Sequence, residues 1–397
     1  MHIMRSLAPW ATSTPERRRK AIPFIIAVAV ALLYPVVLDP LLKATIGVSY
    51  TDPLVSILIL VLLALGLNIV VGYAGLLDLG YAAFFAIGAY TAAFLTSPAS
   101  PLPFRTNFWV AMAISFFVAM LFGVILGAPT LRLRGDYLAI VTLGFGEIVP
   151  RVFLNAESVT GGSGGMNPIG KPSIFGYELN ASNPVGWYYL VVIVGLLSIF
   201  LINRMVDSRL GRAWMAIRED ELAAASAGID RVRTKLLAFA LGASFSGFAG
   251  AIFASRYQFI DPFRFDFTIS VMVLSMVILG GIGNIYGVIV GGIIMASYDR
   301  FLAENLTRWL NQLGDAINVG FLSTVNLQDA RLFIFGGALV LTMLLRPEGL
   351  FPNRRRAAEL HPEEDETVEA YGGPAVEQTH QELYDVQQHD ETTKTVE

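Results

Sequence analysis

The sequence predicts an all-α polytopic membrane protein with about ten (eight to ten) transmembrane helices, some of them broken or re-entrant. Of its 397 residues, 54% are hydrophobic and only 15% are charged, and the mean hydropathy is +0.59. Soluble domains usually carry about a quarter charged residues. Long apolar runs recur along the chain, and one dense charged island stands between two of them.

The apolar runs give the candidate helices in chain order. A basic cluster at 16–20 precedes the first run and is predicted to hold the N-terminal segment 1–21 in the cytoplasm. The sequence does not decide whether residues 76–95 and 268–298 are full spans or re-entrant segments. In 268–298, the sequence GGIGN separates two apolar runs, each well below the ~20 residues that cross a bilayer. The candidate spans are 22–38, 54–71, 76–95, 108–128, 137–154, 186–203, 236–256, 268–280, 284–298 and 330–345.

The distribution of Lys and Arg predicts that both termini are cytoplasmic. In that orientation the cytoplasmic segments up to Arg356 carry 18 Lys and Arg, against nine elsewhere in the same stretch. Basic residues favour the cytoplasmic side of a membrane protein. Residues 357–397 hold 12 Asp and Glu and a single Lys. The segment 352–397 is therefore predicted to be a disordered acidic cytoplasmic tail that follows a transmembrane domain over 22–351.

The charged island covers residues 204–235 and contains seven Lys or Arg and five Asp or Glu. Charges this dense cannot lie in hydrocarbon, which makes the island a cytoplasmic loop between two spans. Within it, Gly228 is predicted to end a short helix in a left-handed turn, and Asp230 to cap the helix that follows. The predicted result is a compact helix–turn–helix knob.

Polar groups in or beside the spans are candidates for a substrate pathway, because burying them in a bilayer is costly. Glu147 and Arg151 are spaced as a helical ion pair, and Asn68 is predicted to bond across helices. The candidate set is Asn68, Gly75, Asp78, Tyr90, Thr142 and Glu147. Small residues at 242, 246, 250 and 254 fall on one helix face and predict close helix packing.

The sequence contains no motif that would bind a nucleotide or a metal ion. Residues 165–172 approach the phosphate-binding pattern G-x-x-x-x-G-K-[ST], but Pro172 lacks the hydroxyl that the last position needs. The chain has no Cys, and its four His residues all fall in the terminal segments. It is therefore expected to be surrounded by membrane lipid, with no cofactor, metal site, nucleic-acid partner or enzymatic activity of its own.

Six blocks of the sequence together resemble one known family. They are residues 66–92, 131–148, 211–229, 235–254, 280–292 and 346–351. These blocks are similar to the permease subunit of branched-chain amino acid ABC importers, the LivM-like family, so the ABC importer permease fold is expected. They span most of residues 54–351 in the order of the family, whereas the tails resemble nothing we can name.

The resemblance implies a larger machine in the plasma or inner membrane of a bacterium or archaeon. The implied partners are a second homologous permease subunit, two cytoplasmic ABC ATPase subunits and an extracytoplasmic substrate-binding protein. The chain would then move branched-chain or other hydrophobic amino acids inward by alternating access, while ATP hydrolysis takes place on a partner.

The resemblance also implies that the charged island couples the permease to the ATPase. The family's segment reads E-A-A-x-x-x-G, and here Leu222 stands at the Glu position, with Glu221 one position early. The sequence REDE at 218–221 supplies charge next to the position where the family's Glu is missing. The implied coupling residues are Arg212, Arg218, Glu219, Asp220, Glu221, Ala224, Gly228 and Asp230.

Two alternatives stay open from the sequence. The same machine can carry urea, short amides or other amino acids, because pocket residues and the exact substrate cannot be read from one sequence. An alternative of another class is an ion-coupled secondary carrier, which needs inverted repeats and a buried titratable relay. Glu147 and Asp78 are the residues that the second alternative would use.

Overall fold

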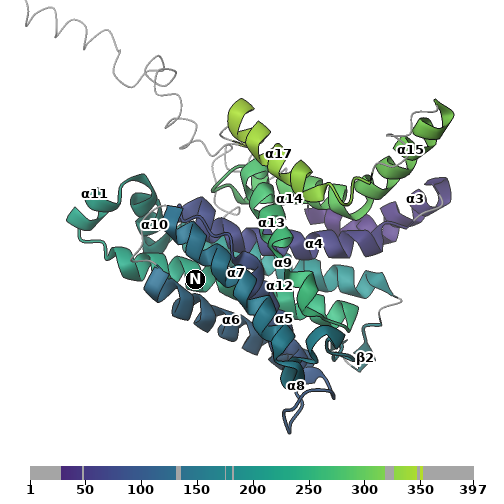
Figure 1. Cartoon of the computed structure of the whole chain (residues 1–397), viewed down its shortest axis with the longest axis horizontal. Coiled ribbons are helices and arrows are strands. Elements are labelled where there is room, and N and C mark those ends of the chain that lie inside the picture. The colour runs from purple at the N-terminus through teal and green to yellow at the C-terminus, as the bar shows by residue number, and fades with distance from the viewer. Residues whose placement is uncertain are drawn as a thin grey trace, which may run out of the picture.

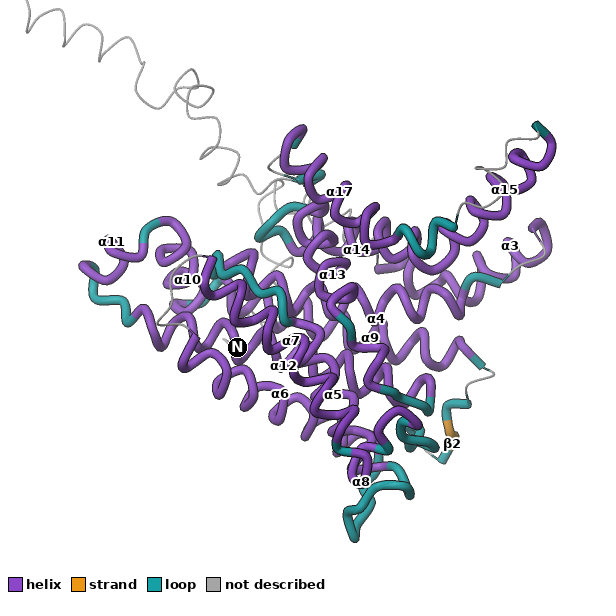
Figure 2. The backbone as a smooth tube through the Cα atoms, in the orientation of Figure 1, coloured by secondary structure: helices purple, strands orange, loops and turns teal. Residues whose placement is uncertain are grey.

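A computed structural model describes residues 28–46, 49–130, 136–174, 176–180, 183–317, 326–346 and 349–351. The predicted N-terminal segment 1–21 and the predicted acidic tail 352–397 lie outside these residues. Helices form nearly all of the described chain, and loops gather at the ends of the bundle (Figure 2).

The first half of the chain builds five of the apolar helices. After a helical stretch from Val28 come η1 (Tyr34–Leu38), α3 (Asp39–Ile46), α4 (Thr51–Leu67), η2 (Asn68–Tyr73), α5 (Tyr81–Thr96), α6 (Phe108–Thr130) and α7 (Asp136–Asn155). Short elements follow in the next connection: α8 (Glu157–Thr160), η3 (Gly162–Gly164), β1 (Ser173–Ile174) and β2 (Tyr177–Glu178). The two strands pair antiparallel, with Ser173 opposite Glu178.

The second half contains the charged island and the remaining helices. Its elements are α9 (Pro184–Val206), α10 (Arg209–Glu219), α11 (Glu221–Ser226), α12 (Arg231–Tyr257), η4 (Pro262–Phe265), α13 (Phe267–Gly280), α14 (Ile285–Ser297), η5 (Tyr298–Leu302), α15 (Ala303–Ala316) and α17 (Arg331–Leu345). Figure 1 shows α10 and α11 projecting at one end of the bundle, away from α8, β2 and α15.

The number of spans agrees with the prediction. Eight helices of the described chain are long and apolar enough to cross a membrane, and two shorter apolar helices, Tyr81–Thr96 and Arg331–Leu345, accompany them. Each coincides with one of the ten predicted runs. The fold is therefore a helical polytopic membrane bundle, as predicted.

The helix α12 lies at the centre of the bundle and packs against α4, α5 and α6. Its small residues allow this contact, because a Cβ on Gly250 would come within 2.4 Å of the Phe85 carbonyl oxygen, and one on Gly247 within 2.5 Å of the Ser115 carbonyl oxygen. The hydroxyl of Tyr81 also donates to the carbonyl of Gly242 at 2.7 Å. The predicted role of the small-residue face in close packing is confirmed.

The predicted span 76–95 is wrong at its start, because the helix α5 begins only at Tyr81. Gly75 has a φ of +69°, a left-handed conformation that breaks the helical path after η2. Asp78 then accepts a hydrogen bond from the Gly80 N–H at 2.9 Å, which stabilises a turn rather than a helix. Residues 74–80 therefore form an irregular connection in which buried and exposed residues alternate.

The segment 268–298 is broken, as the GGIGN sequence indicated. The helix α13 ends at Gly280, and Gly281 and Gly283 adopt φ values of +118° and +79° before α14 starts. The two helices then pack side by side as a hairpin. The predicted end at 298 is wrong, since the helix continues through the π-helical η5 into α15 as one apolar element, Ile285–Leu313.

We expect Gly80→Ala to destabilise the bundle by about 1–3 kcal/mol, as overpacked cores do. Its Cβ would meet the Thr142 carbonyl oxygen at 1.9 Å, so α7 would have to move. The measurement is the melting temperature of the detergent-solubilised protein, followed by size-exclusion chromatography after heating. The control is Gly144→Ala on α7, where a Cβ meets nothing within 4 Å. Equal melting of both variants would contradict this contact.

Candidate functional site

The charged island folds into two short helices that form a knob, residues 208–230, between the long helices α9 and α12. Ser208 caps α10 by accepting a hydrogen bond from the Leu210 N–H at 3.2 Å. Gly211, Trp214 and Ile217, three residues apart, are buried on one face of α10. The remaining face of this amphipathic helix carries the charged residues.

Three contacts fix the knob to the bundle. The Trp214 indole N–H donates to the Thr234 carbonyl at 2.9 Å, and Arg218 Nη1 donates to the Gly72 carbonyl at 2.6 Å. Glu221 forms an ion pair with Lys235, whose side chain is only 6% exposed. The contacts reach both the start of α12 and the end of η2, so the knob is fixed to two separate elements of the bundle.

Asp220 separates α10 from α11, which corrects the single helix predicted before Gly228. Its carboxylate accepts the N–H groups of Ala223 at 3.0 Å and Leu222 at 2.7 Å and so caps α11. These backbone hydrogen bonds lower the pKa of Asp220, because they stabilise the ionised carboxylate. Asp220 therefore stays charged at neutral pH.

The predicted turn at Gly228 is confirmed. Gly228 has a φ of +86°, and the two hydrogen bonds of a Schellman motif close the end of α11. The Ile229 N–H donates to the Ala224 carbonyl at 3.1 Å, and the Gly228 N–H donates to the Ala225 carbonyl at 3.0 Å. Asp230 caps α12 as predicted, by accepting the Arg233 N–H at 3.1 Å.

The predicted coupling residues divide into two groups. Ala224 is buried, Glu221 faces Lys235 and Arg218 reaches Gly72, so these three connect the knob to the bundle. The exposed group consists of Arg212, Glu219, Asp220, Gly228 and Asp230. Leu222, at the position where the family has Glu, is 65% exposed between them. The exposed group and Leu222 form the outer surface of the knob.

Two pathway candidates lie at the end of the bundle that carries the knob. The buried Asn68 accepts the Gly283 N–H at 3.0 Å, which confirms the predicted bond across helices. Gly75 lies under Arg218, since a Cβ on Gly75 would come within 2.7 Å of the Arg218 Cγ. Both residues support the broken backbone near the knob.

Asp78 and Thr142 lie together at the irregular connection 74–80. The Thr142 hydroxyl accepts the Leu79 N–H at 3.1 Å. The Asp78 side chain is fully buried, and its second oxygen has no hydrogen-bond partner among the described residues. The contacts of these two residues hold the connection against α7.

Tyr90 and Glu147 lie apart from the other candidates. The Tyr90 ring packs against Phe153 with the ring centroids 4.3 Å apart. Glu147 pairs with Arg151 at 3.6 Å on α7, and their side chains are 47% and 75% exposed. The structure thus does not unite the six candidates into one site, and it places the Glu147–Arg151 pair on the outside of this chain.

Among the residues that hold the knob, the sequence pointed to Arg218, Glu221 and Ala224. It did not point to Trp214 and Lys235, which also hold the knob, or to the residues that line a cavity at the opposite end. The apolar spacing of Gly211, Trp214 and Ile217 was a signal for the buried face of α10. The cavity contains Asp266, which precedes the predicted span 268–280, and Arg331, which lies at the start of the predicted span 330–345. Their charge was visible in the sequence, but the adjacency of those spans was not.

The structure is a helical polytopic membrane bundle with a charged helical knob between two long spans, the arrangement that the sequence predicted for a membrane permease. Residues 49–345 match the family model described as the permease component of branched-chain amino acid transport systems. The chain belongs to this family and is a permease subunit of an importer. This family membership confirms the resemblance and the class of protein predicted from the sequence.

Several relatives are similar over most of the chain. The high-affinity branched-chain amino acid transport system permease proteins LivM of Salmonella typhimurium and of Escherichia coli are each 40% identical over 324 residues, which cover 76% of this chain and 70% of the relative. The LivH permease protein of Salmonella typhimurium is 25% identical over 304 residues, or 73% of this chain and 90% of LivH. No solved structure matches the chain significantly.

We expect Glu221→Gln to lower the stability of the knob by about 1 kcal/mol, because it leaves the buried Lys235 ammonium without its carboxylate. The partial exposure of Glu221 keeps the effect small. The measurement is the rate at which protease cleaves the 208–230 segment of the purified protein. The control is Glu219→Gln, which is exposed and has no ion-pair partner among the described residues. Equal cleavage of the two variants would show that the pair does not hold the knob.

Proposed function

We propose that this chain is the permease subunit of an ATP-driven importer for branched-chain and other hydrophobic amino acids, and that ATP hydrolysis takes place on partner ATPases. The proposed cargo is inferred from the relatives, whose names specify branched-chain amino acid transport. The coupling residues rest on the geometry of the knob. Its contacts to the bundle are the single observation that supports coupling most directly.

The outer surface of the knob is the proposed contact with the ATPase. It combines exposed charges, including Asp220 with its lowered pKa, with the exposed apolar side chain of Leu222. An apolar centre with a polar rim is typical of a protein interface. The exposed side chains of Arg212 and Glu219 would form part of that rim, where charges guide association more than they add affinity.

Arg218 links this surface to the membrane bundle. Its guanidinium donates to the Gly72 carbonyl, and it lies 3.3 Å from the position of a Cβ on Gly283. Gly72 lies in the last turn of the α4–η2 helix, and Gly283 lies in the break between α13 and α14. A movement of the knob would therefore act on two helices at once, which is what alternating access requires of a coupling element.

The second permease is proposed to cover the exposed face of α7. This face carries Tyr137, Ile140 and Val152, all more than half exposed, together with the Glu147–Arg151 pair. A charge pair inside a span seldom faces lipid, and a protein partner or a water-filled path would receive it. The similarity of the chain to both LivM and LivH supports a partner of related sequence.

The proposed orientation places the knob and both termini in the cytoplasm of a bacterial or archaeal cell. Residues 1–21 and 352–397 would then be cytoplasmic segments on either side of the transmembrane domain. The connection 155–185 and the helix α15 would face outward, where an extracytoplasmic substrate-binding protein would deliver the cargo. The 18-to-nine distribution of basic residues supports this orientation.

Gly228→Val should abolish coupling, because a β-branched residue resists the positive φ that the Schellman turn requires. A Cβ at this position meets nothing within 4 Å, so the effect would come from the backbone alone. We expect the binding protein to dock normally but to stimulate ATP hydrolysis at least roughly tenfold less, a loss of ~1.4 kcal/mol of coupling. The measurement is ATPase activity of the reconstituted complex with and without loaded binding protein.

The matched control for this variant is Gly228→Asn. Asn tolerates the left-handed conformation better than other non-Gly residues, so it should retain most of the stimulation despite its larger side chain. Normal stimulation in Gly228→Val would show that the knob is a passive linker. Equal loss in both variants would point to the side-chain volume rather than to the turn.

Labelling of single Cys substitutions tests the orientation, since the chain has no Cys of its own. Ala227 and Ser173 are both exposed, one beside the turn of the knob and the other in β1. We expect an impermeant maleimide to label Ala227→Cys only from the cytoplasmic side and Ser173→Cys only from outside. Labelling of both from one side would overturn the proposed topology.

A further inference from the structure

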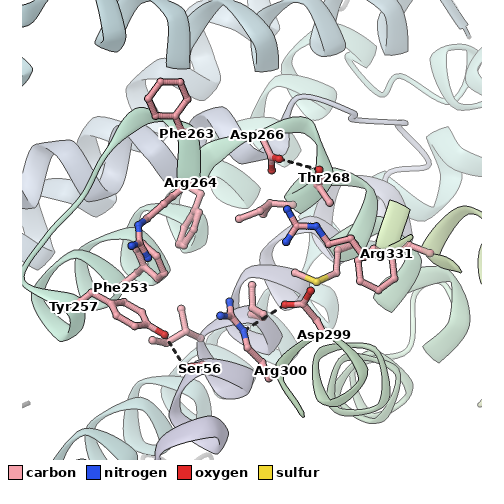
Figure 3. A pocket seen from close by; sticks show the side chains of 16 residues that line it. Ser56, Phe253, Tyr257, Phe263, Arg264, Asp266, Thr268, Asp299, Arg300 and Arg331 are labelled. Carbon is pink, nitrogen blue, oxygen red and sulfur yellow. Dashed lines mark hydrogen bonds and ion pairs between the residues drawn. The ribbon is translucent and has the colours of Figure 1, made fainter. Parts of the chain in front are cut away.

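A cavity of about 290 Å³ lies toward the end of the bundle opposite the knob. Its walls come from α4, the last turns of α12, the junction of η4 and α13, η5, and the start of α17, as Figure 3 shows. Ser56 lies five residues into α4, so the cavity begins roughly 8 Å inside that end of the helix. The volume suits a ligand as small as a free amino acid.

Charged residues from η4, η5 and the start of α17 line this cavity, among them the half-buried Asp266 and the exposed Arg331. Two of its arginines have carboxylate partners: Arg264 pairs with Asp261 at 2.8 Å, and Arg300 with Asp299 at 3.5 Å. These two pairs compensate their own charges. Ionisable groups within a membrane bundle that are not compensated in this way mark ligand or ion paths.

One cation and one anion in the cavity have no partner of opposite charge. Among the described residues, no carboxylate lies within ion-pair distance of Arg331, and no basic group lies within that distance of Asp266. Asp266 accepts only the Thr268 hydroxyl, at 2.9 Å. Figure 3 shows both side chains at the same cavity, with Asp266 beside Thr268 and Arg331 reaching in from the start of the neighbouring helix α17.

Apolar side chains form the rest of the wall. Leu60, Phe253 and Met272 are each less than 10% exposed, and the Phe335 ring is fully buried. They come from four different helices, α4, α12, α13 and α17. The cavity therefore combines one free positive group, one free negative group and a hydrophobic wall.

We propose that this cavity binds the zwitterion of a free aliphatic amino acid during transport. The Arg331 guanidinium would receive the α-carboxylate, in the fork geometry that suits a carboxylate. Asp266 would receive the α-ammonium, and the aliphatic side chain would rest on the wall that contains Leu60, Met272 and Phe335. The inference rests on the proposed function, because it concerns how the same permease holds its cargo.

The complementarity specifies the ligand class in three respects. A carboxylic acid without an amino group would leave Asp266 without an opposite charge, and an amino alcohol would leave Arg331 without one. A ligand that fails to pair a charged group of its site binds less tightly than one that pairs it. Urea carries no charge, so it satisfies neither group as an ion. The cavity therefore favours amino acids over the amides and urea.

The lack of Cys in the chain allows a direct binding test. Ser56→Cys places a near-isosteric thiol on the cavity wall, where Ser56 now bonds to the Tyr257 hydroxyl at 2.7 Å. In the reconstituted importer complex, we expect leucine to slow modification of this thiol by a small methanethiosulfonate. The rate should fall roughly tenfold with leucine at about ten times its dissociation constant. Leucinol and 4-methylpentanoate, which each lack one charge, should protect far less.

Neutral variants assign the two charges separately. In the Ser56→Cys background, Arg331→Gln and Asp266→Asn should each weaken protection by leucine roughly 10- to 100-fold. Asp266→Asn should in addition make leucine and 4-methylpentanoate equally protective, a change that mere misfolding would not produce. The control is Arg308→Gln on α15, whose exposed guanidinium pairs with Glu304 and does not line the cavity, and which should leave protection unchanged.

Leucine uptake and ATPase stimulation of the unsubstituted complex separate this inference from the proposed function. Leucine uptake without protection at Ser56→Cys, or with protection unchanged in both neutral variants, would overturn the zwitterion site and leave the importer intact. A complex that hydrolyses ATP but does not carry leucine would overturn the proposed cargo and this inference together. Equal protection by leucine, leucinol and 4-methylpentanoate would mean that only the apolar wall binds.

Discussion

The need to satisfy broken backbone inside a membrane bundle is the constraint on which the structure depends. Two irregular connections, 74–80 and 281–284, interrupt helices and leave peptide groups, several of them buried, without the hydrogen bonds that a helix supplies. Side chains replace the missing partners. Asn68 receives the Gly283 N–H, Asp78 receives the Gly80 N–H, and Thr142 receives the Leu79 N–H. A buried peptide N–H left without a hydrogen bond would destabilise the fold by about 2–7 kcal/mol, the cost of moving an unpaired amide from water into an apolar environment.

The same bonds connect the broken backbone to the knob. Arg218 contributes a charge-assisted hydrogen bond to the Gly72 carbonyl, four residues after Asn68 on the same helix. Asn68 in turn holds the break between α13 and α14. A rigid knob, closed by the turn at Gly228, is thus joined to the helices through short polar contacts. In the proposed importer, this junction would convert movement of the ATPase into movement of α4 and α14.

Charges that the chain leaves uncompensated, or exposes inside a span, mark where other molecules are expected. The Glu147–Arg151 pair on the open face of α7 fits a second permease. Arg331 and Asp266, which face one cavity without opposite partners among the described residues, fit the two charges of an amino acid. Arg264 and Arg300 lie near the same cavity, but Asp261 and Asp299 already compensate them. Arg331 therefore differs from Arg264 and Arg300 in having no carboxylate partner among the described residues.

The sequence by itself determined the class of fold, the ten apolar helices and the conformation at Gly228, because hydropathy, charge density and the need for a left-handed glycine are local properties. Asn68 could likewise be predicted to form a hydrogen bond to another helix, because its own span is otherwise apolar and its amide needs a partner. Only the tertiary structure decided that α5 begins at Tyr81, that Trp214 and Lys235 hold the knob, and that Asp266 and Arg331 share a cavity. Those facts depend on which helices are neighbours, and contacts between residues far apart in the chain leave no periodic signal in the sequence.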